Sequence, residues 1–196
     1  MIFSENLYLL IKRIFDFVIS LVLLLLLIFP MLIIFFLIKI TSKGNAIYWS
    51  KRIGKNNKIF KMPKFRTMSI ETPSVATHLL TNPNEWITPI GKILRRYSLD
   101  ELPQLWSILY GHMSVVGPRP ALFNQDDLIK LRTELMVHTL TPGLTGLAQI
   151  NGRDELSIKN KVKFDFEYLN NKSLLLDIVI IIKTIKKVFI KPGINH

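Results

Sequence analysis

The sequence contains no cysteine, and this absence excludes a disulfide framework, a thiolate metal site and a cysteine nucleophile. Acidic residues are scarce, with 14 Asp and Glu against 26 Lys and Arg, which gives a formal net charge of +12 at pH 7. Such a basic chain attracts an anionic partner, which can be a nucleic acid, a membrane surface or a phosphorylated ligand. The 196 residues suffice for one catalytic unit of ordinary size.

Charge is missing altogether between residues 17 and 38, where Leu, Ile, Val and Phe predominate. About 22 residues at about 1.5 Å each give a helix of about 33 Å, which matches the hydrocarbon core of a bilayer. Nucleic-acid modules rarely carry such a run, so it favours a membrane surface over nucleic acid. Pro30 is followed by more Ile, Phe and Leu rather than by small residues, which disfavours a cleaved signal peptide. We therefore expect residues 1–40 to form a membrane segment ahead of a catalytic domain over residues 41–196.

Two features of this segment favour a re-entrant helical hairpin over a simple span. Both flanks are basic, with Lys12 and Arg13 before the run and Lys39 and Lys43 after it, so the positive-inside bias places neither end outside. Pro30 lies near the middle of the run, where it removes one helical hydrogen bond and favours a bend. A spanning helix with a mild kink remains the alternative, because neighbouring groups can satisfy the freed backbone in a bilayer.

Past residue 40 the sequence is that of a folded α/β domain with more helix than strand. Apolar stretches predict short strands over 47–52 and 58–65 around a turn at 54–57, and helices near 90–97 and 103–109. Residues 71–84 are polar and contain two prolines, which predicts a loop or lid. Residues 174–190 predict an amphipathic helix, whose lysines at 183, 186 and 187 share one face. That pattern favours a position at the membrane interface over a position in the core.

Several cations lie where the backbone is constrained. Lys64 and Arg66 fall on one face of an extended segment, and such a pair can clamp a diphosphate. Arg119 lies between two prolines whose fixed backbone angles limit its movement, which suits bidentate phosphate recognition. The plain alternatives are a solvated strand face for Lys64 and a surface turn for Arg119.

The densest group of chemically active residues surrounds Asp100 and Glu101. Ser98 and Glu101 have the spacing of a capping box, which would give both acidic residues a structural role. Pro103 disturbs that pattern and predicts a helix that begins at Pro103 instead, with the carboxylates just ahead of it. An ionised Asp100 there can attack phosphorus or bind Mg²⁺, and the nearby Arg95 can neutralise phosphate oxygens. From the residues alone, capping and catalysis both remain open.

Taken in order, these motifs resemble the monotopic phosphoglycosyl transferases, which form the bacterial sugar transferase family. The resemblance covers about residues 12–187. The matching segments are Lys12 to Asp16, the apolar run with Pro30, Lys64 to Met68, Ser98 to Leu105, Gly117 to Pro120, and Pro142 to Gly152. The resemblance implies a mostly α membrane-associated fold, with a re-entrant N-terminal helix and amphipathic helices on the cytoplasmic leaflet of the bacterial inner membrane.

The resemblance also implies a reaction and its site. The family moves a sugar 1-phosphate from a UDP-sugar to polyprenyl phosphate, such as undecaprenyl phosphate, with Mg²⁺ as cofactor, and so begins the assembly of exopolysaccharide, capsule or O-antigen. The residue that matches Asp100 attacks the β-phosphorus, Glu101 completes the catalytic dyad, and Lys64, Arg95 and Arg119 match cations near phosphate groups. The expected partners are a UDP-sugar, polyprenyl phosphate and membrane lipids, with no nucleic acid; a homodimer is left open.

This sequence departs from the family pattern at three positions. Phe29 precedes Pro30 where the family often has serine, so the bend lacks one hydroxyl support. His112 stands where an acidic residue is frequent, and we assign it no metal. Ser50 replaces a frequent glutamine. Two alternatives remain: a transferase in which Asp100 only binds Mg²⁺ and the lipid phosphate attacks directly, and a non-catalytic membrane scaffold.

Overall fold

A computed structural model describes residues 2–73, 82–152 and 155–190 of the chain. Helices predominate in this part of the chain, and the strands form two small two-stranded sheets. The elements are α1 (Ile2–Thr41), β1 (Ile47–Ile53), β2 (Ile59–Phe65), α2 (Pro83–Trp86), α3 (Pro89–Arg96), α4 (Gln104–Leu109), β3 (Ser114–Val116), α5 (Asp126–Glu134), β4 (Gly143–Thr145), α6 (Leu147–Ile150), α7 (Ile158–Asn171) and α8 (Leu174–Ile190). The predicted mostly α fold with some strand is therefore confirmed.

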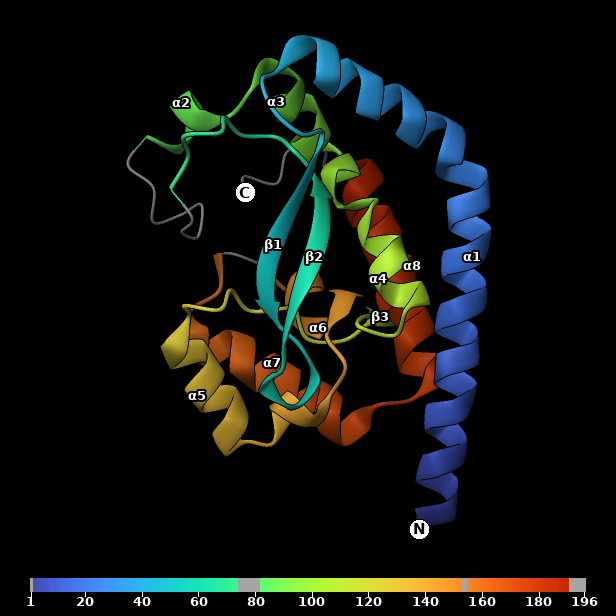
Figure 1. Cartoon of the computed structure of the whole chain (residues 1–196). Helices are drawn as coiled ribbons and strands as arrows, with labels where there is room; N and C mark the ends of the chain where they lie inside the picture. Colours follow the sequence, from blue (N-terminus) through green and yellow to red (C-terminus); the bar gives the residue numbers. More distant parts are fainter. Residues whose placement is uncertain (1, 74–81, 153–154, 191–196) are drawn as a thin grey trace.

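The apolar N-terminal segment forms one helix, α1, which contains Pro30 in its interior. Figure 1 shows that α1 runs along one side of the molecule and changes direction in its second half. Proline causes such a bend because it lacks the amide hydrogen and its ring clashes with the preceding turn. Many of the apolar side chains of α1, including Leu25, Leu26 and Phe29, are exposed on the protein surface. In length and composition α1 can cross a membrane, and it fits a membrane anchor.

The strands β1 and β2 form the predicted hairpin. They pair antiparallel from Ile47 opposite Phe65 to Ile53 opposite Ile59. Asn56 and Asn57 turn the chain between them with positive φ angles, which asparagine tolerates better than most residues. The helices α3 and α4 also lie where the sequence predicts helices. Of the predicted loop over residues 71–84, residues 74–81 lie outside the described part, and α2 begins at its end.

The second sheet joins β3 and β4 as a short parallel pair, with Ser114 opposite Gly143 and Val116 opposite Thr145. A Cβ atom on Gly143 would come within 2.1 Å of the backbone nitrogen of Gly117, so only glycine allows this close approach. This sheet joins the segment that ends in Gly117 to the segment that begins at Pro142. Two of the motifs singled out in the sequence are therefore neighbours.

Polar contacts tie α1 to the rest of the protein. The Lys12 ammonium lies 2.7 Å from the buried Asp177 carboxylate on α8, and the Asp16 carboxylate accepts a hydrogen bond from the Val115 amide of β3. The Arg13 guanidinium donates to two backbone carbonyls at the end of α4, those of Ile108 and Leu109. Apolar side chains of α1, α4, β3 and α8 form the largest core between these contacts.

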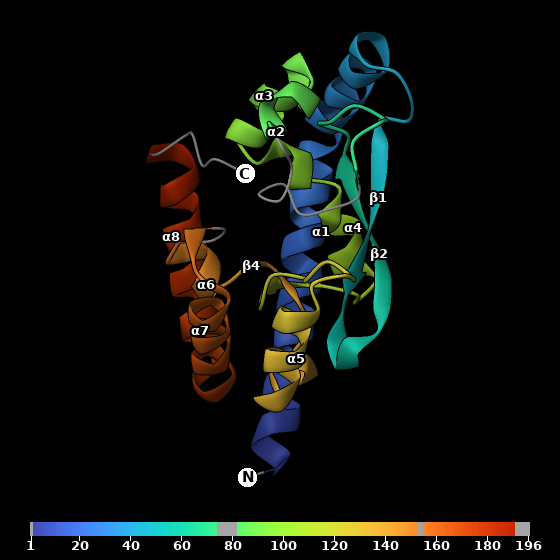
Figure 2. The same cartoon turned by 90° about the vertical axis from the view of Figure 1, so that its left-hand side faces the viewer.

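The last three helices of the described chain lie together. Figure 2 shows α6, α7 and α8 on one side of the molecule and the β1–β2 hairpin on the opposite side. On α8, Lys183 and Lys186 are exposed, as are Leu175, Ile178 and Ile182, whereas Asp177 points inward to α1. A helix with exposed lysines and exposed apolar side chains has the composition of an interfacial helix.

Candidate active site

A cavity of about 510 Å³ opens between the β1–β2 hairpin on one side and the helices α5, α6 and α7 on the other. Its lining is strongly basic, because side chains from five separate parts of the fold bring cations to it: Lys51, Arg52, Lys64, Arg66, Arg95, Arg119, Arg132 and Lys161. Among the described residues, Asp100 is the only acidic residue that lines the cavity. A basic hollow with one carboxylate suits a substrate that carries several phosphate charges.

Asp100 and Glu101 lie in a single 3₁₀ turn between α3 and α4 (residues Leu99–Glu101). Ser98, which precedes this turn, has a positive φ of 54° and its side chain makes no capping hydrogen bond. The capping box is therefore not formed. Pro103 instead stands at the start of α4, as its position in the sequence predicts. Both carboxylates are nevertheless buried, with Asp100 5% and Glu101 7% exposed.

Glu101 is held between two cations that come from different parts of the chain. Its Oε1 atom accepts hydrogen bonds from Lys64 Nζ and from Arg119 Nη2, each at 3.0 Å. Lys64 projects from β2, and Arg119 projects from the loop after β3. Burial lowers the pKa of the Lys64 ammonium below its ordinary value, and the adjacent Glu101 carboxylate offsets part of this effect. Glu101 thus contacts both cations, whereas Asp100 lines the cavity.

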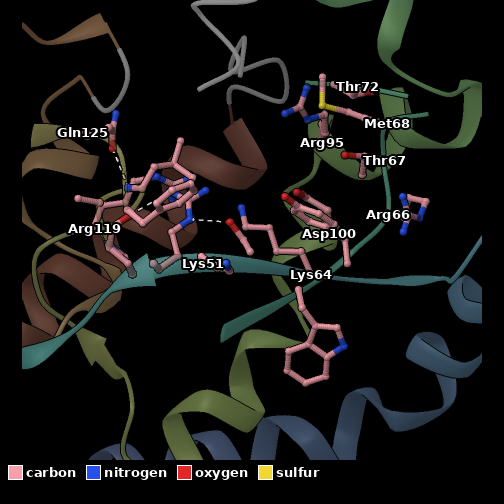
Figure 3. Close-up of a pocket in the computed structure, with 18 of the residues that line it drawn as sticks. Lys51, Lys64, Arg66, Thr67, Met68, Thr72, Arg95, Asp100, Arg119 and Gln125 are labelled. Atoms are coloured by element: carbon pink, nitrogen blue, oxygen red, sulfur yellow. Dashed lines mark hydrogen bonds between the residues drawn. The ribbon is translucent and has the colours of Figure 1, made fainter. Parts of the chain in front are cut away.

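The structure brings together most of the residues that the sequence singled out. Figure 3 shows Lys64, Arg95, Asp100 and Arg119 around the same cavity. Arg66 lies at its edge, where its Nε donates to the Asn45 carbonyl at 2.7 Å. Pro30 lies in α1 and is not among the residues that line the cavity. His112 does not line it either, and its ring stacks on Phe60 with centroids 6.0 Å apart.

Sequence reasoning missed two residues close to this site, Arg132 on α5 and Asp165 on α7. Both are buried, and they form an ion pair with 2.7 Å between Arg132 Nη2 and Asp165 Oδ2. A signal did exist, because Arg132 follows the buried Leu128 by four residues and Asp165 follows the buried Val162 by three. Each charge therefore occupies the apolar face of its helix, where an unpaired charge is costly.

No group of three or more His, Asp or Glu residues that could hold a metal ion occurs in the part of the chain that the structure describes. A metal cage made from protein side chains alone is therefore not present among those residues. Asp100 provides a single hard oxygen ligand in the cavity.

Comparisons with known proteins agree with this geometry. The family model described as bacterial sugar transferase matches residues 7–191. The exopolysaccharide production protein ExoY of Sinorhizobium fredii is 40% identical over 197 residues, which covers 93% of this chain and 87% of the relative. The UDP-glucose:undecaprenyl-phosphate glucose-1-phosphate transferase of Escherichia coli is 39% identical over 193 residues, but these cover 94% of this chain and only 41% of that longer protein. The undecaprenyl-phosphate galactose phosphotransferase of Salmonella typhimurium is 38% identical, again with 41% of its length covered. This chain belongs to the bacterial sugar transferase family.

Proposed function

We propose that this protein transfers a sugar 1-phosphate from a UDP-sugar to polyprenyl phosphate and releases UMP. The names of the Escherichia coli and Salmonella typhimurium relatives describe sugar phosphate transfer to undecaprenyl phosphate, which supports this reaction. The observation that carries the proposal is a carboxylate, Asp100, in a cavity lined by cations. Such a cavity can neutralise the diphosphate of one substrate and the lipid phosphate of the other.

Asp100 is the nucleophile in the mechanism we propose. One of its oxygens forms a bond to the β-phosphorus while the bond from that phosphorus to the bridging oxygen breaks, and UMP leaves with the bonding electrons. The phosphate oxygen of polyprenyl phosphate then attacks the same phosphorus, which yields the polyprenyl diphosphate sugar and frees the carboxylate. Two displacements through an aspartyl phosphate replace one direct encounter between two anions.

The cations support both displacements. Lys64 and Arg119 converge on Glu101 at the wall of the cavity, so their positive charges are held in place before the substrate arrives. Charges that are already oriented stabilise the charge that develops in the transition state without further reorganisation. Glu101 keeps the two cations together and prevents their mutual repulsion from opening the site.

The residues present fit Mg²⁺ as a cofactor. Magnesium in phosphate-transferring sites binds through one or two carboxylates and completes its shell with water and substrate phosphate oxygens. Asp100 would hold it, and the bound ion would supply positive charge next to the diphosphate. A ligand set of this kind needs no cluster of three acidic side chains, in agreement with the described residues.

The covalent step has a direct test. Incubation with UDP-sugar alone should release UMP and leave one phosphosugar on the protein, detectable by mass spectrometry. Asp100→Asn should abolish this adduct and reduce transfer by more than about a thousandfold, the order of loss expected when a covalent nucleophile is removed. Asp126→Asn, at an exposed acidic residue on α5, serves as the control and should transfer normally. UMP release that strictly requires the lipid would instead favour direct attack. A protein that shows no transfer, and whose function in the cell survives Asp100→Asn, would favour a non-catalytic membrane scaffold.

We further propose that α1 is re-entrant at Pro30 and leaves both of its ends on the cytoplasmic face of the inner membrane. The domain over residues 41–196 then meets soluble UDP-sugar and membrane lipid on that face, with α8 at the interface. The cysteine-free sequence allows single cysteines at Phe3 and Asn45 to be labelled from either side. Equal accessibility from the cytoplasmic side supports the proposal, and accessibility from opposite sides contradicts it.

The sugar can be identified by measuring UMP release across a panel of UDP-sugars with polyprenyl phosphate and Mg²⁺. A clear preference for one donor would identify the substrate. Absence of UMP release with every donor, from a folded protein in lipid, would contradict the proposed reaction.

A further inference from the structure

The loop that carries Arg119 is held through its backbone carbonyls. Each carbonyl from residue 117 to residue 121 accepts a hydrogen bond, and the donors come from α6, β4, α5 and β1. The donors, in order, are Gln149 Nε2 at 3.4 Å, the Gly143 amide at 2.9 Å, Arg132 Nη1 at 2.8 Å, Arg52 Nη1 at 3.1 Å and the Ile53 amide at 2.9 Å. Two of the five loop residues are prolines and have no amide hydrogen to donate. The Gly117 amide donates to the Thr145 carbonyl at 2.9 Å, and the five carbonyl contacts supply the rest of these backbone anchors.

The donor at the central position is the buried arginine of α5. Arg132 is 8% exposed, and its Nη1 donates to the carbonyl of Arg119 itself. The other edge of its guanidinium donates twice to Asp165 Oδ2, from Nε at 3.0 Å and from Nη2 at 2.7 Å. A guanidinium is planar and its donors have a fixed geometry, so the contacts with Asp165 also determine where Nη1 points.

These contacts form a chain that ends in the candidate active site. Asp165 on α7 orients Arg132, Arg132 holds the main chain of Arg119, and the Arg119 side chain donates to Glu101 at 3.0 Å. A buried ion pair between α5 and α7 would by itself need only the contacts between Arg132 and Asp165. The third hydrogen bond, directed at the residue that we place next to the substrate phosphates, has no part in joining these two helices.

We propose that Arg132, oriented by Asp165, is a positioning residue that fixes the backbone of Arg119 and thereby the place of its guanidinium against the substrate phosphates. This proposal rests on the proposed function. Arg132 also lines the cavity, so direct contact with substrate is the competing explanation. Asp165 does not line the cavity and accepts hydrogen bonds from Arg132, but its charge also interacts with Lys161, which does line the cavity. An effect that passes through Arg132 depends on Arg119, whereas an effect through Lys161 does not.

A double-mutant cycle separates the two explanations. Arg132→Met should lower kcat for UMP release by about 10- to 100-fold, because displacements of about 1 Å can cost about a hundredfold. In an Arg119→Met background, the added Arg132→Met substitution should lower kcat by less than about threefold, because no Arg119 guanidinium is left to position. An equal loss in both backgrounds would mean that Arg132 binds substrate itself and would overturn the proposal. Lys130→Met, at an exposed lysine of α5, is the control and should keep wild-type turnover.

The second variant covers the case in which Arg132→Met does not fold. Asp165→Asn keeps the shape of the side chain but removes its charge, and it should lower kcat by about tenfold in the wild-type background, the lower end of the range for a lost outer partner. In the Arg119→Met background its effect should disappear. Unchanged turnover in Asp165→Asn, or an equal loss in both backgrounds, would overturn the proposal.

Hydrogen exchange provides a readout that does not depend on catalysis. The amides of residues 115–117, 119, 121 and 122 should exchange at least about tenfold faster in Arg132→Met and in Asp165→Asn than in wild type, because local opening becomes easier when an anchor is lost. The Lys130→Met control should exchange like wild type. Unchanged protection of this segment in both variants would overturn the proposal even if the protein proved to have a different substrate. Failure of UMP release in the wild type would instead contradict the proposed reaction.

Discussion

The contact of Glu101 with two cations predicts a large loss of stability when its charge is removed. In Glu101→Gln the side chain keeps its shape and one acceptor, but Lys64 and Arg119 are left near each other without the carboxylate between them. The Glu101 side chain is 8% exposed, and those of Lys64 and Arg119 are 14% and 25% exposed. Water therefore replaces little of the lost interaction, and both cations keep their desolvation cost while they lose the carboxylate that they share.

The magnitude follows from this burial. Removal of one partner of a buried ion pair typically costs about 3–5 kcal/mol, and the partial exposure of Arg119 favours the lower end, about 3 kcal/mol. For a chain of this size each kcal/mol changes Tm by about 2–4 °C, so we expect Tm to fall by about 6–12 °C. Lys64→Met should partly restore stability to Glu101→Gln, because it removes one of the two stranded cations.

Thermal unfolding in detergent or nanodiscs, followed by tryptophan fluorescence, measures this effect. Glu134→Gln, at an exposed carboxylate of α5, is the matched control and should leave Tm within about 1 °C of wild type. The reasoning is refuted if Glu101→Gln melts like this control, or if the Lys64→Met and Glu101→Gln losses simply add. In either case Glu101 would not be compensating the two cations.

Two further predictions concern the same cavity. Because burial lowers the pKa of Lys64, its positive charge is lost at a lower pH than that of a surface lysine, so UMP release should decline early on the alkaline side. Lys64→Arg, which stays charged, should extend activity to higher pH, and identical alkaline limbs for both proteins would contradict this. Gly91→Ala should lower stability by about 1–3 kcal/mol, because its Cβ atom would come within 2.2 Å of the Thr67 carbonyl oxygen at the cavity wall. Lys92→Ala, at an exposed position of the same helix, is the control. Equal melting temperatures for the two variants would show that the cavity wall accommodates the added methyl group without loss of stability.

Local sequence signals predicted the hairpin and the short helices well. The asparagines at 56 and 57 adopt the positive φ angles that a tight turn requires, and Pro103 sets the start of α4, so the information lies within a few residues of the feature. The misleading signal was also local. The spacing of Ser98 and Glu101 fits a capping box, but the left-handed backbone at Ser98 directs the chain into a 3₁₀ turn and Glu101 turns to Lys64 instead.

What could not be predicted depends on contacts between distant segments. Lys64 and Arg119 each lie many residues from Glu101, and no local sequence pattern predicts that both will contact the same carboxylate oxygen. The strands β3 and β4 have three residues each, which is too short for an alternating pattern. Arg132 and Asp165 were overlooked because charged residues are usually exposed, and only their place on apolar helix faces distinguished them.

The anchoring of the Arg119 loop also bears on how the protein is made. The ribosome produces α1 before the rest of residues 41–196, and this helix can enter the membrane while those residues are still unsynthesised. Asp100, Glu101 and Arg119 follow, but of the anchors of the Arg119 loop only Arg52 and Ile53 precede it, and the others require Gly143, Gln149 and the pair of Arg132 with Asp165 to have emerged. The geometry of the site should therefore form late, after the protein has reached the membrane. A nascent chain truncated before α7 would carry every proposed catalytic residue and still lack the arrangement that we expect catalysis to require.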